Sequence, residues 1–196
     1  GVVVLLSVTY ANEKCSNELC WDNPKINEYI TDEMINDTFK PAHPKKWKQN
    51  KETWLSTSNI SDVLYQYTNK YDDFEFLGAV PIDFDKKFDK DNCVINEICN
   101  LSVKELLEKK KTKLGIVFNL DPHDKPGSHW VCMFSDFKKG LICYFDSYGY
   151  EPNEEISNLL NRIKEQGNKL IQDNILQLEN KNQKEFIIKK NKNRHQ

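Results

Sequence analysis

The sequence has few glycines and prolines, no long apolar run and no large excess of one charge sign. Seven glycines and seven prolines among 196 residues exclude a collagen-like or low-complexity chain. The apolar opening, GVVVLLSV, has only eight residues and is too short to span a membrane. A net charge of −2 gives no support to a nucleic-acid binder or a membrane-surface protein. We therefore expect one sizeable domain with an extension, and a function that requires neither nucleic acid nor membrane.

The chain also lacks an initial Met and lacks a basic segment before its apolar opening. Residues 1–8 are therefore not a complete signal peptide, and a buried strand or helix is expected there. The start at Gly1 favours a piece of a longer protein.

The six cysteines lack the spacing of a zinc site. Cys15 and Cys20 have four residues between them, and Cys93 and Cys99 have five, so no CxxC pair occurs. Cys132 and Cys143 lie in apolar runs, where a thiol is a small buried hydrophobe. We expect reduced thiols in a cytoplasmic protein, with no metal and no cofactor.

Two local charge imbalances interrupt the even composition. Residues 72–100 hold eight acids against three lysines, and residues 179–196 hold six basic residues against two acids. Both runs are expected to be solvated faces, although the acidic run could contact a basic partner.

The N-terminal half is expected to be mainly helical. Apolar spacing predicts a helix over residues 23–39, and prolines predict a linker over 41–47. A second unit begins at Trp54, and Ser61 is predicted to cap a helix that contains Val63, Leu64, Tyr67 and Tyr71. A third helix is predicted over 101–113, where Ser102 and Glu105 form a capping box. Between them, residues 73–85 are predicted to be extended and broken by Gly78 and Pro81.

The C-terminal half has a strand pattern. Apolar β-rich runs at 114–120, 129–137 and 141–149 predict three strands, and KKG at 138–140 suits a tight hairpin turn between the last two. A helix follows from residue 154 and is predicted to end near Gly167, and Phe186 to Ile188 form a further strand. The fold class is α+β, with helices packed on a mixed sheet.

His129 and Asp146 are the candidate chemical pair. They are 17 positions apart, but His129 opens one predicted hairpin strand and Asp146 ends the other, so they can meet at one edge of the sheet. A carboxylate that binds one imidazole nitrogen leaves the other nitrogen free to act as a base. The alternative is a loop histidine and a turn aspartate without catalytic roles.

Other nucleophiles and bases fit less well. Ser128 is adjacent to His129 and cannot face it from a separate element, and Cys132 and Cys143 lie inside strands. His43 and His123 stand beside prolines and are expected to be structural or surface residues.

The hairpin GSHWVCMFSDFKKGLICYFDSYGYEP resembles that of the ubiquitin-like-protein cysteine proteases, which include the SUMO-specific and adenoviral proteases. The large-DNA-virus branch, typified by the African swine fever virus polyprotein protease, is the most similar. WLSTSNISDVLYQY, FLGAVPIDF and FIIKKNKNRHQ also resemble segments of that branch, in the same order. The resemblance implies a papain-like mixed sheet over residues 54–196, preceded by an N-terminal helical extension over 1–53.

The same resemblance assigns roles to individual residues. His129 would be the general base, Asp146 would orient it, and Trp130 would line the substrate channel. Gln196 would stabilise the oxyanion with its side-chain amide. The family nucleophile is a Cys-Gly that follows this Gln, and no cysteine in the sequence has that context, so we expect a fragment or a pseudoenzyme that is inactive as it stands.

The implied function is a monomeric cysteine endopeptidase that cleaves after Gly-Gly-type sequences in a viral polyprotein or a ubiquitin-like modifier. Its expected location is the host cytoplasm, the virus factory or the virion. The alternative is a non-catalytic module that binds ubiquitin-like proteins or serves as a virion scaffold. An acetyltransferase of the same clan would need a regulatory lobe, which the sequence does not indicate.

Overall fold

A computed structural model describes residues 41–42, 47, 50, 52–90 and 92–192, which belong to one compact unit. The expected helix at 23–39, His43, Cys15, Cys20 and Gln196 lie outside the described residues, as does most of the expected extension. The described elements follow the order α5 (Thr57–Lys70), β1 (Phe74–Pro81), α6 (Asn96–Cys99), α7 (Val103–Glu108), β2 (Lys113–Asn119), β3 (Trp130–Asp136), β4 (Leu141–Phe145), α8 (Glu154–Gln172) and β5 (Ile187–Lys190).

The strands form one five-stranded mixed sheet in the order β1-β2-β3-β4-β5. The central pairs β2–β3 and β3–β4 are antiparallel, and the outer pairs β1–β2 and β4–β5 are parallel. Parallel neighbours need a crossover connection. The helices α6 and α7 lie in the connection between β1 and β2, and α8 lies in the connection between β4 and β5. The α+β prediction is therefore confirmed, and the start of β3 shares one edge of the sheet with the ends of the other four strands.

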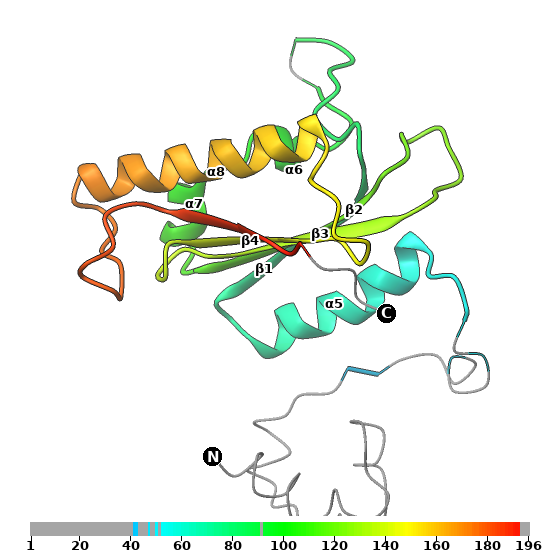
Figure 1. Cartoon of the computed structure of the whole chain (residues 1–196), viewed down its shortest axis with the longest axis horizontal. Coiled ribbons are helices and arrows are strands. Elements are labelled where there is room, and N and C mark those ends of the chain that lie inside the picture. The colour runs from blue at the N-terminus through cyan, green and yellow to red at the C-terminus, as the bar shows by residue number, and fades with distance from the viewer. Residues whose placement is uncertain (1–40, 43–46, 48–49, 51, 91, 193–196) are drawn as a thin grey trace, which may run out of the picture. The chain divides into compact units, whose positions relative to one another are not determined.

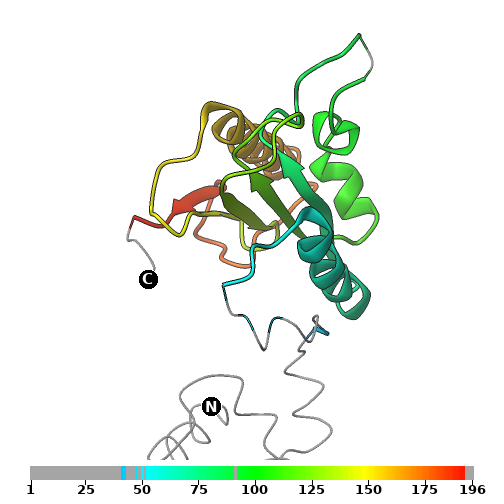
Figure 2. The same cartoon turned by 90° about the vertical axis from the view of Figure 1, so that its right-hand side faces the viewer.

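Helices cover both faces of the sheet. The helix α8, together with α6 and α7, lies on one face, and α5 lies on the other (Figure 1, Figure 2). Alternate side chains of β3 and β4 point into the core beneath α8, including Val131, Met133, Ile142 and Tyr144. On the opposite face, the Tyr65 ring of α5 packs edge-on against Phe76 of β1.

The start of α5 differs from the prediction. Ser56, not Ser61, is the N-cap, and its hydroxyl accepts a hydrogen bond from the Asn59 backbone N–H at 3.2 Å. The Asn59 side chain accepts one in return from the Ser56 N–H, so the two residues form a capping box. Ser61 lies one turn inside the helix.

Gly167 does not end α8, contrary to prediction. The helix continues to Gln172, and the Phe186 ring lies against Gly167 so closely that an added β-carbon would be 2.6 Å from it. The glycine is therefore required by packing between α8 and the segment before β5. In α7, Ser102 caps the helix as predicted, but the helix ends earlier, at Glu108.

The prediction of reduced thiols is wrong for one pair. Cys93 and Cys99 form a disulfide, because the turn into α6 brings their Cα atoms to 6.4 Å, within the range for such a bond. Cys132 and Cys143 are free and partly buried.

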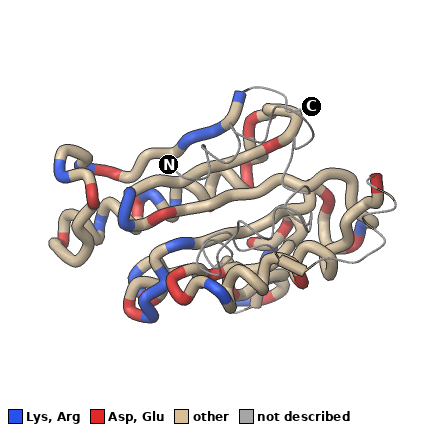
Figure 3. The backbone as a smooth tube through the Cα atoms, turned by 90° about the horizontal axis from the view of Figure 1, so that it is seen from below, with Lys and Arg blue, Asp and Glu red and all other residues tan. Residues whose placement is uncertain are grey.

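Half of the acids in the run over 72–100 pair with basic residues of the fold. Four of its eight acids pair with a basic residue from another element: Asp73 with Lys113, Glu75 with Lys111, Asp83 with His123, and Asp85 with Arg162. Acidic and basic positions are interspersed along the chain (Figure 3). The fold thus accounts for half of these acids without a basic partner.

Candidate active site

His129 and Asp146 meet at the edge where β3 begins and β4 ends. The Nε2 atom of His129 lies 2.6 Å from Oδ1 of Asp146. The imidazole is about one-fifth exposed and the Asp146 carboxylate is buried, so the pair opens to solvent on the histidine side only. Since the carboxylate binds Nε2, Nδ1 is the ring nitrogen left to accept a proton.

The loop from residue 120 to 129 holds His129 in place. The His129 carbonyl accepts the Leu120 N–H at 2.9 Å, which extends the β2–β3 pairing by one step. Inside the loop, Ser128 donates its hydroxyl to Asp121 at 3.0 Å. Gly127 has φ +96° and packs against the Asn119 amide so tightly that a β-carbon would clash with it. Ser128 thus supports the loop, whereas its sequence position had argued only against a role as nucleophile.

Asp146 is held from three directions. Its Oδ1 also accepts the Tyr148 N–H at 2.9 Å, and its Oδ2 accepts the Tyr150 N–H at 3.2 Å. Burial alone would raise the pKa of this carboxyl. The hydrogen bonds from His129 and the two backbone N–H groups outweigh burial and hold the pKa of Asp146 below its ordinary value. Asp146 is therefore a fixed anion suited to orient His129.

One aromatic ring packs against His129, and the predicted channel residue Trp130 contacts a different segment. The Tyr148 ring lies 4.8 Å from the His129 ring, centroid to centroid, and stacks on Tyr150 at 5.8 Å. Trp130, the predicted channel residue, donates its Nε1–H to the Leu55 carbonyl at 3.0 Å, which ties β3 to the segment before α5. Sequence reasoning missed Tyr148, although its position two residues after Asp146 in the turn was a usable signal.

Neither free cysteine of the described residues is placed to act as a nucleophile. Successive strand residues point to opposite faces, and His129 and Asp146 share the alternation of Val131 and Tyr144, which face α8. Cys132 and Cys143 have the opposite alternation. Burial also raises the pKa of both thiols, which disfavours the reactive thiolate.

A second histidine–carboxylate pair lies on the same edge of the sheet. His123 Nδ1 is 2.6 Å from Asp83 Oδ2, and its backbone N–H donates to Asp83 Oδ1 at 2.9 Å. Both bonds join the loop before β3 to the segment after β1. This pair has a structural role, as the sequence position of His123 indicated.

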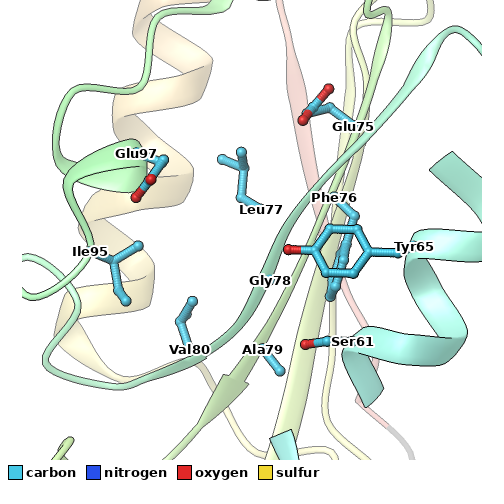
Figure 4. A pocket seen from close by; sticks show the side chains of 10 residues that line it. All are labelled: Ser61, Tyr65, Glu75, Phe76, Leu77, Gly78, Ala79, Val80, Ile95 and Glu97. Carbon is cyan, nitrogen blue, oxygen red and sulfur yellow. The ribbon is translucent and has the colours of Figure 1, made fainter. Parts of the chain in front are cut away.

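A pocket of about 410 Å³ lies beside β1, on the far side of β2 from the His129–Asp146 pair. Tyr65 comes from α5, Leu77 and Val80 from β1, and Ile95 and Glu97 from the start of α6 (Figure 4). No residue predicted to form the active site lines it.

Within the described part of the chain, no helix is both long and apolar enough to cross a membrane. The same residues contain no group of three or more His, Cys, Asp or Glu side chains that could hold a metal ion.

Comparison of the sequence with known protein families identifies the family of the chain. The family of the Vaccinia virus I7 processing peptidase, Peptidase_C57, matches residues 32–185. The chain belongs to this cysteine protease family. The match covers the whole hairpin that carries His129 and Asp146.

Two curated relatives agree with the family. The chain is 32% identical to R355 of Acanthamoeba polyphaga mimivirus, a protein assigned as a thiol protease, over 76% of this chain and 47% of the relative. It is 26% identical to the cysteine protease S273R of African swine fever virus, over 78% of this chain and 60% of the relative. The chain thus spans about half to three-fifths of the length of these relatives.

The fold matches a solved structure of the same group. The crystal structure of the African swine fever virus pS273R protease aligns with a TM-score of 0.54 and 18% identity, over 96% of this chain and 67% of the other. At this identity the likeness establishes the shared fold, and the predicted resemblance to this protease fold is confirmed.

Proposed function

We propose that the chain supplies the general base and the orienting carboxylate of a cysteine-type endopeptidase. The observation that carries the proposal is the 2.6 Å contact between His129 Nε2 and Asp146 Oδ1, which leaves Nδ1 free. Membership of the processing-peptidase family supports it. In this role His129 removes the proton from a cysteine thiol, and the thiolate attacks the scissile carbonyl.

The nucleophile has to come from outside the described residues. Cys93 and Cys99 are joined to each other, and Cys132 and Cys143 have the wrong alternation and raised pKa values. By resemblance to the family, we propose a Cys-Gly motif that follows Gln196 in the intact protein. Residues 1–196 alone would then hold the base without its thiol and would not hydrolyse a peptide bond.

The remaining steps use residues already named. The Gln196 amide would donate a hydrogen bond to the carbonyl oxygen as it gains negative charge. Protonated His129 would pass its proton to the departing amine, which leaves a thioester between enzyme and substrate. Water then attacks the thioester with His129 again as base, releasing the acid and restoring the thiol.

The proposed substrates are chains with Gly-Gly-type cleavage sites, in a viral polyprotein or a ubiquitin-like modifier. The Tyr148 ring, 4.8 Å from the His129 ring, favours a confined approach to the imidazole, which glycines without side chains would fit. Names of the relatives support the assignment, since some strains of African swine fever virus carry the protein as "SUMO-1 cysteine protease S273R". We propose action as a monomer in the host cytoplasm, the virus factory or the virion.

The test uses the intact protein with a ubiquitin-like probe that ends in a Gly-Gly electrophile, and a Gly-Gly-X peptide. We expect covalent labelling and cleavage, both abolished by His129→Ala. Asn161→Ala, at an exposed position of α8, is the control and should leave activity intact. Binding of the probe without labelling or cleavage would reject the protease and favour a non-catalytic module.

A further inference from the structure

Asn191 contacts Asp146 through both functional groups of its side chain. Its Nδ2 donates to the Asp146 carbonyl at 2.6 Å, and its Oδ1 accepts the Asp146 N–H at 2.9 Å. The amide is thus hydrogen-bonded to both main-chain polar groups of one residue, 45 positions earlier in the chain. Only one orientation of the amide satisfies both bonds, because one group must donate and the other accept.

These two side-chain bonds continue the hydrogen bonding of β4 with β5 one step past the last paired residues. The parallel pairing of β4 with β5 stops at Tyr144 and Lys190, and the next backbone bond, from the Asn191 N–H to the Tyr144 carbonyl, is long at 3.4 Å. Among the described residues, the β4–β5 pairing does not reach the backbone of Asp146. The side chain of Asn191 takes over that role at the residue that orients the histidine.

We propose that Asn191 is a positioning residue for the His129–Asp146 pair. The Asp146 carboxylate binds Nε2 of His129 and also accepts the Tyr148 and Tyr150 N–H groups of the turn. If the Asp146 backbone is not fixed, the bonds to the turn can pull the carboxylate away from His129. Without the amide, the Asp146 backbone is held by the turn alone, through its bond from Gly149. The carboxylate can then follow the turn and leave the imidazole.

A second contact connects the end of β5 to the turn that follows Asp146. Lys190, the residue before Asn191, places its Nζ 2.7 Å from the Glu151 carboxylate, at the far end of the turn that follows Asp146. Two successive residues of the β5 exit therefore hold the two ends of this turn. Asn191 also opens the NKNRHQ segment that contains Gln196, so one residue links the base to the chain that leads to the proposed oxyanion donor.

The inference rests on the proposed function, but it can be tested without activity. Imidazole ¹⁵N NMR of the intact protein at neutral to alkaline pH reports which ring nitrogen carries the proton. His129 should be protonated on Nε2 and His123 on Nδ1, because each of these atoms faces a carboxylate. The two histidines thus give opposite signals in one spectrum, and His123 is an internal control for correct folding.

We expect Asn191→Ala to convert His129 to a mixture of the two protonation forms while His123 is unchanged. In the labelling and cleavage assay, kcat should fall by about 10- to 100-fold with KM nearly constant, as for a displaced catalytic group. Asn161→Ala, at an exposed position of α8, should change neither quantity.

An unchanged His129 signal in Asn191→Ala would overturn the inference, as would a rise in KM with kcat constant. If that variant fails to fold and the His123 signal is lost, Asn191→Asp decides the question. It keeps the shape and the Oδ1 acceptor but cannot donate to the Asp146 carbonyl, and wild-type behaviour in it would contradict the proposal. If the wild-type protein never reacts with the probe, the proposed function fails, while the NMR comparison still decides the role of Asn191.

Discussion

The ring of Phe186 lies directly against the backbone of Gly167, with no room for a side chain between them. Phe186 is fully buried, and its N–H is bound by the Asn168 side chain at 2.7 Å, so the ring has little freedom to withdraw. This contact packs the segment before β5 against α8. It therefore helps to position β5, which is followed by Asn191, the residue that binds the Asp146 backbone.

Gly167→Ala is therefore expected to destabilise the protein, although alanine is the better helix former. A β-carbon forced against the Phe186 ring costs about 1–3 kcal/mol, more than the ~1 kcal/mol that alanine contributes in a helix interior. The free energy of unfolding in urea measures the net loss. Asn158→Ala, at an exposed position of the same helix, is the control and should be neutral or slightly stabilising. A more stable Gly167→Ala variant would show that the ring moves freely.

Asp146→Asn should reduce proteolysis less than His129→Ala does. An asparagine keeps one oxygen for His129, but its NH₂ group cannot accept the Tyr150 N–H that Oδ2 binds now. The turn is weakened while the base remains, whereas His129→Ala removes the base altogether. Rates of Gly-Gly-X cleavage by the two variants compare them. Equal losses would mean that Asp146 does more than orient the ring.

Acid should remove a contribution to stability that depends on Asp146. Its pKa is lowered by folding, so the contribution is fully present above the unfolded value of 3.8 and is lost as the pH falls through the lower folded value. Urea unfolding of wild type and Asp146→Asn, compared between about pH 6 and pH 2, isolates this term. The stability difference between them should be constant near neutrality and shrink on acidification. If the difference in unfolding free energy between wild type and Asp146→Asn grew below pH 4, folding would not lower the pKa of Asp146.

The disulfide should be detectable directly. Alkylation without reductant followed by peptide mapping should recover Cys93 linked to Cys99, with Cys132 and Cys143 alkylated once the protein is unfolded. For so short a loop, reduction is expected to lower the free energy of unfolding by about 2 kcal/mol. Cys132→Ser is the matched control for loss of a thiol that forms no bond. Alkylation of Cys93 and Cys99 without reductant would restore the original expectation of reduced thiols.

The hairpin and its pair were predictable because both depend on local patterns. Continuous apolar β-rich runs and the KKG turn predict the strands β3 and β4, and the antiparallel geometry then brings His129 beside Asp146. The α8 helix followed from its apolar stripe. Each of these inferences needed only residues within a short window.

What escaped prediction depends on contacts between distant segments. Gly167 has the sequence of a helix end, but Phe186 gives it another role. Asn191 lies in a segment singled out from the sequence, yet its bonds to Asp146 cross 45 positions. The Ser56 cap is different, since Asn59 three residues later was a readable capping-box signal that the choice of Ser61 overlooked.

The strand directions have a consequence for variation in this fold. Because β2 and β4 end where β3 begins, the connections at 120–129 and 146–153 carry His129 and Asp146, and the connection after β1 reaches the first of them through the Asp83–His123 pair. These loops can change length or composition without shifting the register of any strand. At the opposite end of the sheet, the tight turn at 137–140 between β3 and β4 has no such freedom. Changes in these loops therefore alter the surroundings of the pair while the sheet beneath stays the same.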